Sequence, residues 1–422
     1  MKTNKLAILG GNKTYKFETK PFTSIGKEEL DAATKVIKTG FLSQYLGEKS
    51  KEFNGGKYVN IFERECERYF KVKNAVVVNS WTSGLIASVG AIDINPGDEI
   101  IVPCWTMCAS ATAILHWNAI PVFADISSEG YNIDISKIEN KITKRTKAII
   151  VVEMSGWPLD MDKIMKIAKK YKLKIIEDSA DTIGYTFNNK NLGAYSDAVT
   201  NSLYASHVIT GAGFGGMVCF NDKKKYDRAK LLRGWGRSSA IFNESEGLKQ
   251  RFSEKVDGIP YDGKYIFSEL GFNFLPSEIS AAFALEQLKK LKKNISIREK
   301  NFKKILNFFK SYSRYFDLPI QNPKVKTGWL AYPVIIKKNS KINRRDMQIF
   351  LEKKGVQTRT IFTGNILRQP IMKNKKFKKI KNSSINSDNI MKNGILIGCH
   401  QGLKNKEINY VFACIKSFLK RS

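Results

Sequence analysis

Short, continuously apolar segments alternate with amphipathic segments through the first half of the chain. Apolar segments of strand length occupy residues 75–78, 99–103, 121–125, 148–152 and 174–177. Segments with helical periodicity occupy residues 26–40, 61–72, 108–117 and 162–171, and a further helix begins near residue 84. Strands that are apolar on both faces and separated by helices are typical of a mainly parallel sheet with helices on both sides. The sequence therefore predicts an α/β fold.

A long lysine-rich helix is predicted at residues 281–310 and divides the chain. We expect an N-terminal arm at residues 1–25, a large domain at 26–285, and a bridging helix with a smaller C-terminal domain at 286–422. A chain of 422 residues is long enough for two such domains.

Composition excludes several classes of protein. No apolar run approaches the ~20 residues of a membrane span, and the N-terminus lacks the apolar stretch of a secretory signal. We therefore expect a cytoplasmic protein without a membrane partner. The six cysteines show no metal-ligand spacing, so we predict reduced thiols and no metal site.

The formal net charge of +32 is large, but the lysines are spread along the chain rather than gathered in one stretch. This distribution does not favour a nucleic-acid partner. A basic surface would still attract a small anionic ligand such as a sugar linked to a nucleoside diphosphate.

The segment Asn79–Gly84 lies between a predicted strand and a predicted helix. Backbone amides at a helix N-terminus, flanked by small hydroxyl residues, can bind an anion. Taken alone, the same segment is also explained as an ordinary helix cap.

The segment KIIEDSAD ends a predicted strand with Glu177 and Asp178. In open α/β sheets, ligands bind beyond the carboxyl ends of the strands. An aspartate there can keep a pyridine nitrogen protonated, or it can simply cap the following turn.

His207 is one of three histidines and precedes the glycine-rich stretch Gly211–Gly216. A lone histidine usually has a structural role, but glycines allow the backbone to approach a ligand closely. The neighbouring glycines therefore favour a functional role for His207.

The order and spacing of these segments resemble the DegT/DnrJ/EryC1/StrS family of sugar aminotransferases, from about residue 24 to residue 415. The motifs that carry the resemblance are GFLSQYLG, VNSWTSGL, VPCWTMCASATAI, IPVFADI, IIEDSADTIG, SLYASH, GFNFLPSEISAAFALEQL and TRTIFTGNILRQP. The resemblance implies the aspartate aminotransferase fold, with a mainly parallel seven-stranded sheet in the large domain and a smaller α+β domain. It also implies pyridoxal 5′-phosphate (PLP) or pyridoxamine 5′-phosphate as cofactor, and a homodimer with shared active sites.

The family's binding roles can be transferred to matching positions. The resemblance implies phosphate contacts from Trp81, Thr82 and Ser202. It implies that Asp178 pairs with the pyridine nitrogen, that Asp181 lies near the 3-hydroxyl, and that Met107 covers the ring face. Asn273 would reach the phosphate of the neighbouring subunit. Met107, Phe214 and Leu275 differ from the residues usual in the family, which affects the expected substrate geometry.

His207 stands where aminotransferases of this family have the lysine that links covalently to the cofactor aldehyde. An imidazole cannot form that link. Two branches of the family carry histidine here, and both are sugar 3-dehydratases. The resemblance therefore implies removal of the C3 hydroxyl from a nucleotide-linked 4-keto-6-deoxy sugar, with glutamate as amino donor and His207 as catalytic residue. An aminotransferase that uses another lysine, and a non-catalytic sugar-nucleotide-binding relative, stay open as alternatives.

One histidine-bearing branch also holds a [2Fe–2S] cluster, and the segment LLRGWGRSSAIFNESEG resembles that branch most. Its cluster-bearing members have cysteines just after this GWGR, where this chain has Ser238 and Ser239. No cysteine occurs between Cys219 and Cys399. Because such clusters are held by thiolates, we predict that no iron–sulfur cluster is present.

Overall fold

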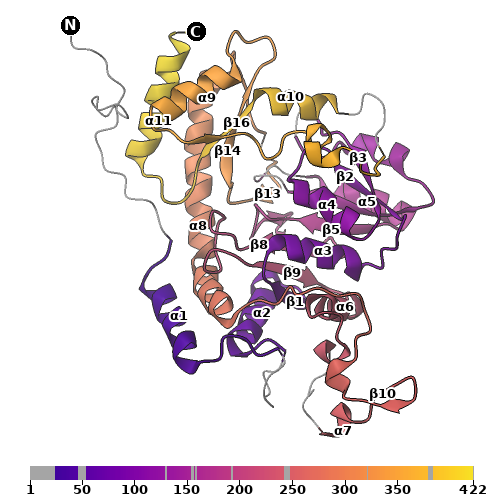
Figure 1. Cartoon of the computed structure of the whole chain (residues 1–422). Helices are drawn as coiled ribbons and strands as arrows, with labels where there is room; N and C mark the ends of the chain where they lie inside the picture. Colours follow the sequence, from indigo (N-terminus) through magenta and orange to yellow (C-terminus); the bar gives the residue numbers. More distant parts are fainter. Residues whose placement is uncertain are drawn as a thin grey trace.

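A seven-stranded sheet lies at the centre of the large domain (Figure 1). Its strand order is β1-β9-β8-β5-β4-β2-β3. Only β9 runs antiparallel to its neighbours, so the predicted mainly parallel sheet is confirmed. The strands are β1 (Asn74–Val78), β2 (Glu99–Pro103), β3 (Ile120–Ala124), β4 (Thr146–Val152), β5 (Lys174–Asp178), β8 (Ala198–Ser202) and β9 (Gly216–Phe220). The computed structural model describes residues 24–45, 54–128, 131–153, 156, 159–191, 193–241, 248–320, 322–378 and 384–421.

Alternate residues of each strand belong to two separate hydrophobic cores, one on each face of the sheet. Ile100 and Val102 of β2 belong to one core, whereas Ile101 belongs to the other. The first face is covered by α3 (Trp81–Ala91) and α4 (Cys108–His116), with α6 (Lys223–Arg233) against β1 and β9. The second face is covered by α2 (Lys57–Phe70), α5 (Met161–Tyr171) and the first half of α8 (Glu278–Lys310). This two-sided burial explains why the strands are continuously apolar.

The start of α3 differs from the prediction in a way that matters for the site. The helix begins at Trp81 rather than near Gly84, because Ser80 caps it. The Ser80 hydroxyl accepts a hydrogen bond from the Ser83 amide at 3.1 Å. The helix therefore starts earlier, and the amides of Trp81 and Thr82 lie at its N-terminus. Similarly, α2 begins at Lys57, before the predicted residue 61.

The helix α8 is 33 residues long and runs from the large domain into the C-terminal domain (Figure 1). There it packs against an antiparallel four-stranded sheet in the order β12-β14-β16-β15. The elements of this α+β domain are β12 (Phe316–Asp317), β14 (Ala331–Ile336), β15 (Thr358–Arg359), β16 (Gly394–Gly398), α9 (Arg344–Lys353), α10 (Ile385–Asn393) and α11 (Asn405–Leu419).

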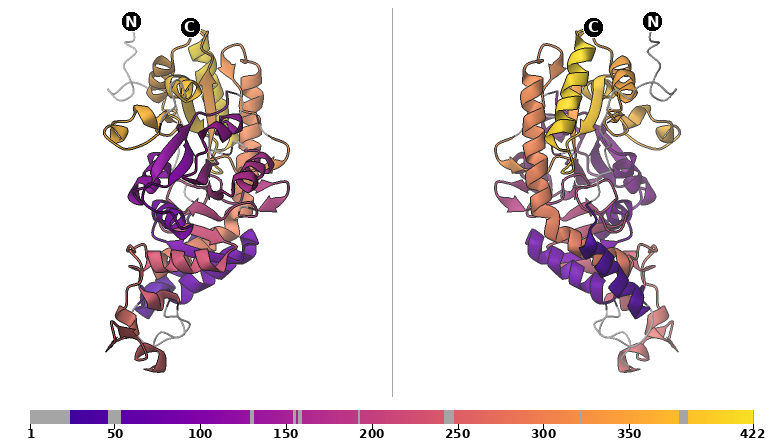
Figure 2. Two further views of the ribbon diagram at one scale, coloured as in Figure 1. Left: turned by 90° about the vertical axis from the view of Figure 1, so that its right-hand side faces the viewer. Right: turned by 90° about the vertical axis from the view of Figure 1, so that its left-hand side faces the viewer.

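Two smaller features lie outside these layers. A three-stranded sheet joins β6 (Thr186–Phe187), β7 (Lys190–Asn191) and β13 (Val325–Lys326). Between α6 and α8 the chain forms an excursion that extends away from the rest of the molecule (Figure 2). It contains α7 (Leu248–Arg251), β10 (Lys255–Val256) and β11 (Ile259–Pro260). Across the described residues, no helix is long and apolar enough to cross a bilayer.

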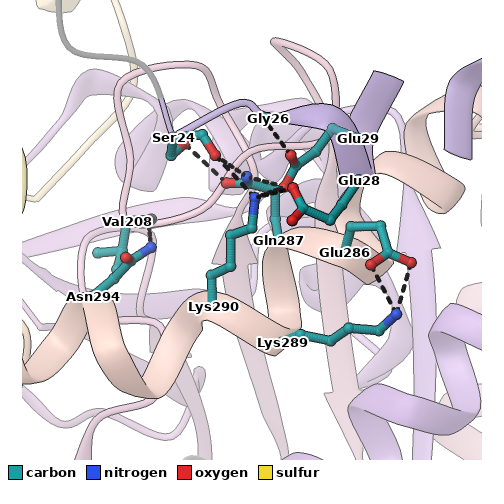
Figure 3. Close-up of polar contacts among 10 residues, drawn as sticks. All are labelled: Ser24, Gly26, Glu28, Glu29, Val208, Glu286, Gln287, Lys289, Lys290 and Asn294. Carbon is teal, nitrogen blue, oxygen red and sulfur yellow. Dashed lines mark hydrogen bonds and ion pairs between the residues drawn. The ribbon is translucent and has the colours of Figure 1, made fainter. Parts of the chain in front are cut away.

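The first helix, α1 (Lys27–Thr39), packs along α8. Lys290 of α8 forms an ion pair with Glu29, with Nζ and Oε1 2.6 Å apart (Figure 3). Gln287 accepts a hydrogen bond from the Ser24 hydroxyl at 3.1 Å and donates one to the Ser24 carbonyl at 3.0 Å. These contacts fix the chain just before α1.

Candidate active site

A cavity of about 1240 Å³ lies at the carboxyl ends of β4, β5 and β8. The N-terminus of α3 and residues of β15 and β16 complete its wall, so both domains contribute. The cavity brings together seven of the eight predicted site residues: Trp81, Thr82, Met107, Asp178, Asp181, Ser202 and His207. The eighth, Asn273, is exposed and does not line the cavity of its own chain.

The N-terminus of α3 forms one end of the cavity. Ser80, Trp81 and Thr82 line it, and Ser202 at the end of β8 lines it as well. The glycine at the start of β9 makes this arrangement possible. A Cβ on Gly216 would lie 2.5 Å from the Ser80 carbonyl carbon and from the Trp81 nitrogen. The amides at a helix N-terminus and the helix dipole make this end suitable for a phosphate group.

Asp178 is buried at the end of β5, with 2% of its surface exposed. Its Oδ2 accepts a hydrogen bond from the Ser110 hydroxyl at 2.7 Å, and its Oδ1 accepts one from the Ala180 amide at 3.4 Å. Burial raises the pKa of Asp178 to about 6, whereas these donors and Trp81 favour the ionised form. A buried carboxylate in this position is suited to pair with a protonated ring nitrogen.

His207 lies in the turn after β8, with its side chain 16% exposed. Its Nε2 is 3.9 Å from Oδ1 of Asp181. Burial and the positive charge of Arg298 lower the pKa of His207 to about 4. The Asp181 carboxylate opposes this shift, but at 3.9 Å it is at the outer limit of an ion pair, and desolvation prevails. The imidazole is therefore neutral at neutral pH.

Residues of the helix α8 hold the turn that contains His207 in place. Asn294 donates a hydrogen bond from Nδ2 to the Val208 carbonyl at 3.2 Å (Figure 3). Arg298 is 2% exposed and donates to the carbonyls of Trp329 and Leu330, both at 3.0 Å. Its guanidinium is thus fixed in place where it acts on His207.

Met107 and Phe214 both line the cavity with large exposed fractions, 42% and 47%. Met107 precedes α4, so its thioether can cover the face of a bound ring. Leu275, in contrast, lies outside the cavity.

Several cavity residues were not identified from the sequence. Glu153 after β4, Arg298 of α8 and His400 after β16 carry no local motif, and Arg359 of β15 lies in the motif TRTIFTGNILRQP but was given no role. Only the position of Glu153 directly after a predicted strand offered a signal, because ligands gather at carboxyl ends of strands.

These residues fit PLP. The N-terminus of α3 and Ser202 are suited to bind the cofactor phosphate. Asp178 is suited to pair with the ring nitrogen, and Met107 is suited to cover one face of the ring. His207 and Asp181 line the same cavity but have none of these binding roles, so they are candidates to contact a substrate there.

Comparison with known proteins identifies the family of this chain. The model of the DegT/DnrJ/EryC1/StrS aminotransferase family matches residues 24–416. The chain belongs to this family. The resemblance seen in the sequence and the fold it implied are thereby confirmed.

Individual members of the DegT/DnrJ/EryC1/StrS family are similar to this chain over most of its length. The chain is 28% identical to the lipopolysaccharide biosynthesis protein RfbH of Salmonella typhimurium, over 93% of this chain and 90% of that protein. It is 31% identical to GDP-4-keto-6-deoxy-D-mannose 3-dehydratase of Escherichia coli O55:H7, over 87% and 94%. The structure of E. coli GDP-4-keto-6-deoxy-D-mannose-3-dehydratase with bound hydrated PLP superposes with a TM-score of 0.82 at 28% identity, covering 93% and 97%.

Proposed function

We propose that the protein is a PLP- and pyridoxamine phosphate-dependent 3-dehydratase of a nucleotide-linked 4-keto-6-deoxy sugar. It would serve deoxysugar and surface polysaccharide biosynthesis. One observation carries the proposal: His207 lies in the cavity at the position where an aminotransferase of this family requires lysine. Among the described residues that line the cavity, none is a lysine.

The cofactor would be held by the amides of Trp81 and Thr82, the Ser202 hydroxyl and the Asp178 carboxylate. When bound, PLP withdraws electrons from the atoms attached to it, which weakens bonds at the neighbouring carbon of a substrate. The fit of the cavity and the similarity to a dehydratase that binds PLP support this assignment.

His207 would carry the proton that the loss of a hydroxyl requires. A neutral imidazole takes up one proton and then returns it to the departing C3 oxygen, which leaves as water. The low pKa of His207 makes its protonated form a strong acid toward that oxygen. Asp181, 3.9 Å away, would stabilise the imidazolium while it exists.

The substrate class is supported by three observations. By name, the dehydratase relative of Escherichia coli O55:H7 acts on a GDP-linked keto-deoxy sugar and that of Saccharopolyspora spinosa on a dTDP-linked one. The cavity volume of about 1240 Å³ suits a ligand larger than the cofactor alone. Arg359 lines the cavity and is exposed, and the chain carries a net charge of +32, which attracts a diphosphate.

The experiment is to incubate the purified protein with PLP, glutamate and a panel of GDP-, CDP- and dTDP-linked 4-keto-6-deoxy sugars. A dehydratase yields a sugar that lacks one oxygen atom, together with 2-oxoglutarate and ammonia in equal amounts. An aminotransferase yields an amino sugar and 2-oxoglutarate without ammonia. Mass spectrometry of the sugar and enzymatic measurement of ammonia distinguish the two, and no product with any sugar would favour the non-catalytic alternative.

We further propose a homodimer in which Asn273 completes the partner's site. Asn273 is exposed and lies outside its own cavity, although its backbone carbonyl accepts a hydrogen bond from the Asn79 side chain at 3.2 Å. Asn79 directly precedes the cap of α3. The side chain of Asn273 therefore stays available to another subunit.

A further inference from the structure

Three residues with buried carboxyl groups lie at the ends of β4 and β5. Val152 pairs with Asp178 in the sheet, and the amide of Glu153 donates to the Asp178 carbonyl at 2.9 Å. Glu177 directly precedes Asp178. All three side chains are buried, with exposed fractions of 1% for Glu153, 1% for Glu177 and 2% for Asp178.

The three groups differ sharply in their hydrogen bonds. Asp178 accepts hydrogen bonds from Ser110 and Ala180. Within the described part of the chain, neither carboxyl oxygen of Glu153 has a hydrogen-bond partner, and Oε1 of Glu177 has none. Glu153 also lines the cavity wall. It is thus an almost fully buried acid, and no described residue donates a hydrogen bond that would stabilise its negative charge.

Among the described residues, no cation compensates the charge of an ionised Glu153. The groups that act on it electrostatically are Glu177 and Asp178 of β5, and Tyr185 beyond β5 is acted on by it in turn. Two negative charges at this spacing in a buried site repel each other strongly. Burial and these neighbours raise the pKa of Glu153 well above its usual value.

We propose that Glu153 is a positioning residue that acts through Asp178: it keeps its proton, so the negative charge at this edge stays on Asp178, where the cofactor ring binds. Asp178 has hydrogen-bond donors in Ser110 and Ala180, and it is the group proposed to pair with the ring nitrogen. A second anion beside it would raise the proton affinity of Asp178 and neutralise the contact. The inference rests on the proposed PLP site and adds a role for a residue that is not among those proposed to hold the cofactor.

The first measurement is the infrared spectrum of the cofactor-free protein. A protonated carboxyl has a C=O stretch separate from that of a carboxylate. We expect such a band in the wild type at neutral pH and a weaker one in Glu153→Gln, where the remaining signal comes from Glu177, whose pKa burial raises to about 7. Absence of any protonated-carboxyl band in the wild type at neutral pH would overturn the proposal without need of a variant.

The second measurement is unfolding by denaturant as a function of pH. Glu153 is protonated in the folded chain but ionised in the unfolded chain at neutral pH, so its proton must be taken up on folding. Above the ordinary pKa of glutamate, the wild type should lose stability relative to Glu153→Gln by up to tenfold in the unfolding equilibrium constant per pH unit. A difference between the two proteins that does not change with pH would indicate a purely structural role.

The third measurement connects Glu153 with the cofactor. The affinity for PLP should fall toward acid pH as Asp178 becomes protonated, with the same midpoint in the wild type and in Glu153→Gln. A midpoint at least one pH unit lower in Glu153→Gln would show that Glu153 is ionised in the wild type, and the proposal would be wrong. Asp178→Asn is the control and should bind PLP weakly without this midpoint. If the wild type itself fails to bind PLP, the proposed function fails, whereas the infrared and unfolding results still decide the state of Glu153.

Discussion

Nε2 of His207 lies 3.9 Å from Oδ1 of Asp181, within one cavity wall that also contains the buried Arg298. Burial and the positive charge of Arg298 keep the imidazole neutral, whereas a carboxylate at the distance of Asp181 attracts it once it is protonated. A group held in this way can accept a proton and release it readily.

Replacing His207 with asparagine tests this role. The cofactor contacts proposed above come from Trp81, Thr82, Ser202 and Asp178, so His207→Asn should keep its affinity for PLP. Turnover should fall by about 10²- to 10⁴-fold, the usual effect of losing a general acid–base. Equilibrium titration with PLP and steady-state assays measure the two quantities. Full turnover in this variant would mean that another group carries the proton.

Replacing His207 with lysine should change the chemistry rather than remove it. A lysine amine can link covalently to the cofactor aldehyde, which imidazole cannot do. We expect His207→Lys, treated with PLP and borohydride, to gain the mass of one reduced cofactor at residue 207, detected by peptide mass spectrometry. The wild type is the control and should gain no such adduct at this position. Dehydration should weaken, although lysine still exchanges protons and partial activity is compatible with the proposal.

Part of this site was predictable from the sequence because local signals encode it. The capped start of α3 and the strand that ends in Asp178 each combine a short motif with a change of periodicity. Glu153 and Arg298 carry no such signal. In the sequence, Arg298 is one cation in a lysine-rich helix, and its burial follows only from the packing of α8 against Trp329 and Leu330.

The boundary of α3 shows a related difference. Helical periodicity alone placed its start near Gly84, but the side chain of Ser80 adds the preceding turn. The ability of the site to bind an anion depends on that turn, because it brings the amides of Trp81 and Thr82 to the helix end. A contact between two serines three residues apart thus decides what the helix presents to a ligand.

The lowered pKa of His207 also predicts how stability depends on pH. The unfolded chain binds a proton at His207 near pH 6.5, whereas the folded chain does so only near pH 4. Between these values the unfolded state holds more protons, so stability falls as the pH falls through this window. His207→Asn should lose less stability than the wild type across it, by up to about 1.4 kcal/mol per pH unit. Urea unfolding at pH 7, 6 and 5 measures the difference. His400, whose pKa burial also lowers to about 4, is present in both proteins and cancels.

We predict that dehydration requires neither iron nor an electron-donating reductase. The motivation is the pair Ser238 and Ser239 after Arg237, where cluster-bearing relatives would have cysteines. Protein purified without oxygen should contain no stoichiometric iron or acid-labile sulfide, and turnover should be unchanged by an iron chelator. Stoichiometric iron and sulfide in active protein would contradict the prediction.

The last prediction concerns sharing of sites between subunits. If Asn273 reaches the phosphate of the neighbouring cofactor, Asn273→Ala and His207→Asn each impair both sites of their own homodimers. In a mixed dimer, one site receives both substitutions and the other receives neither, so the second site should work. Mixing the two inactive variants under conditions of subunit exchange should restore up to a quarter of wild-type activity, because half of the dimers are mixed and each has one intact site. Mixing His207→Asn with Asp178→Asn is the matched control: both residues line the same cavity, so every site stays impaired and no activity should return. Recovery in neither mixture would mean that Asn273 serves its own subunit, and equal recovery in both would mean that the regained activity does not depend on a site shared through Asn273.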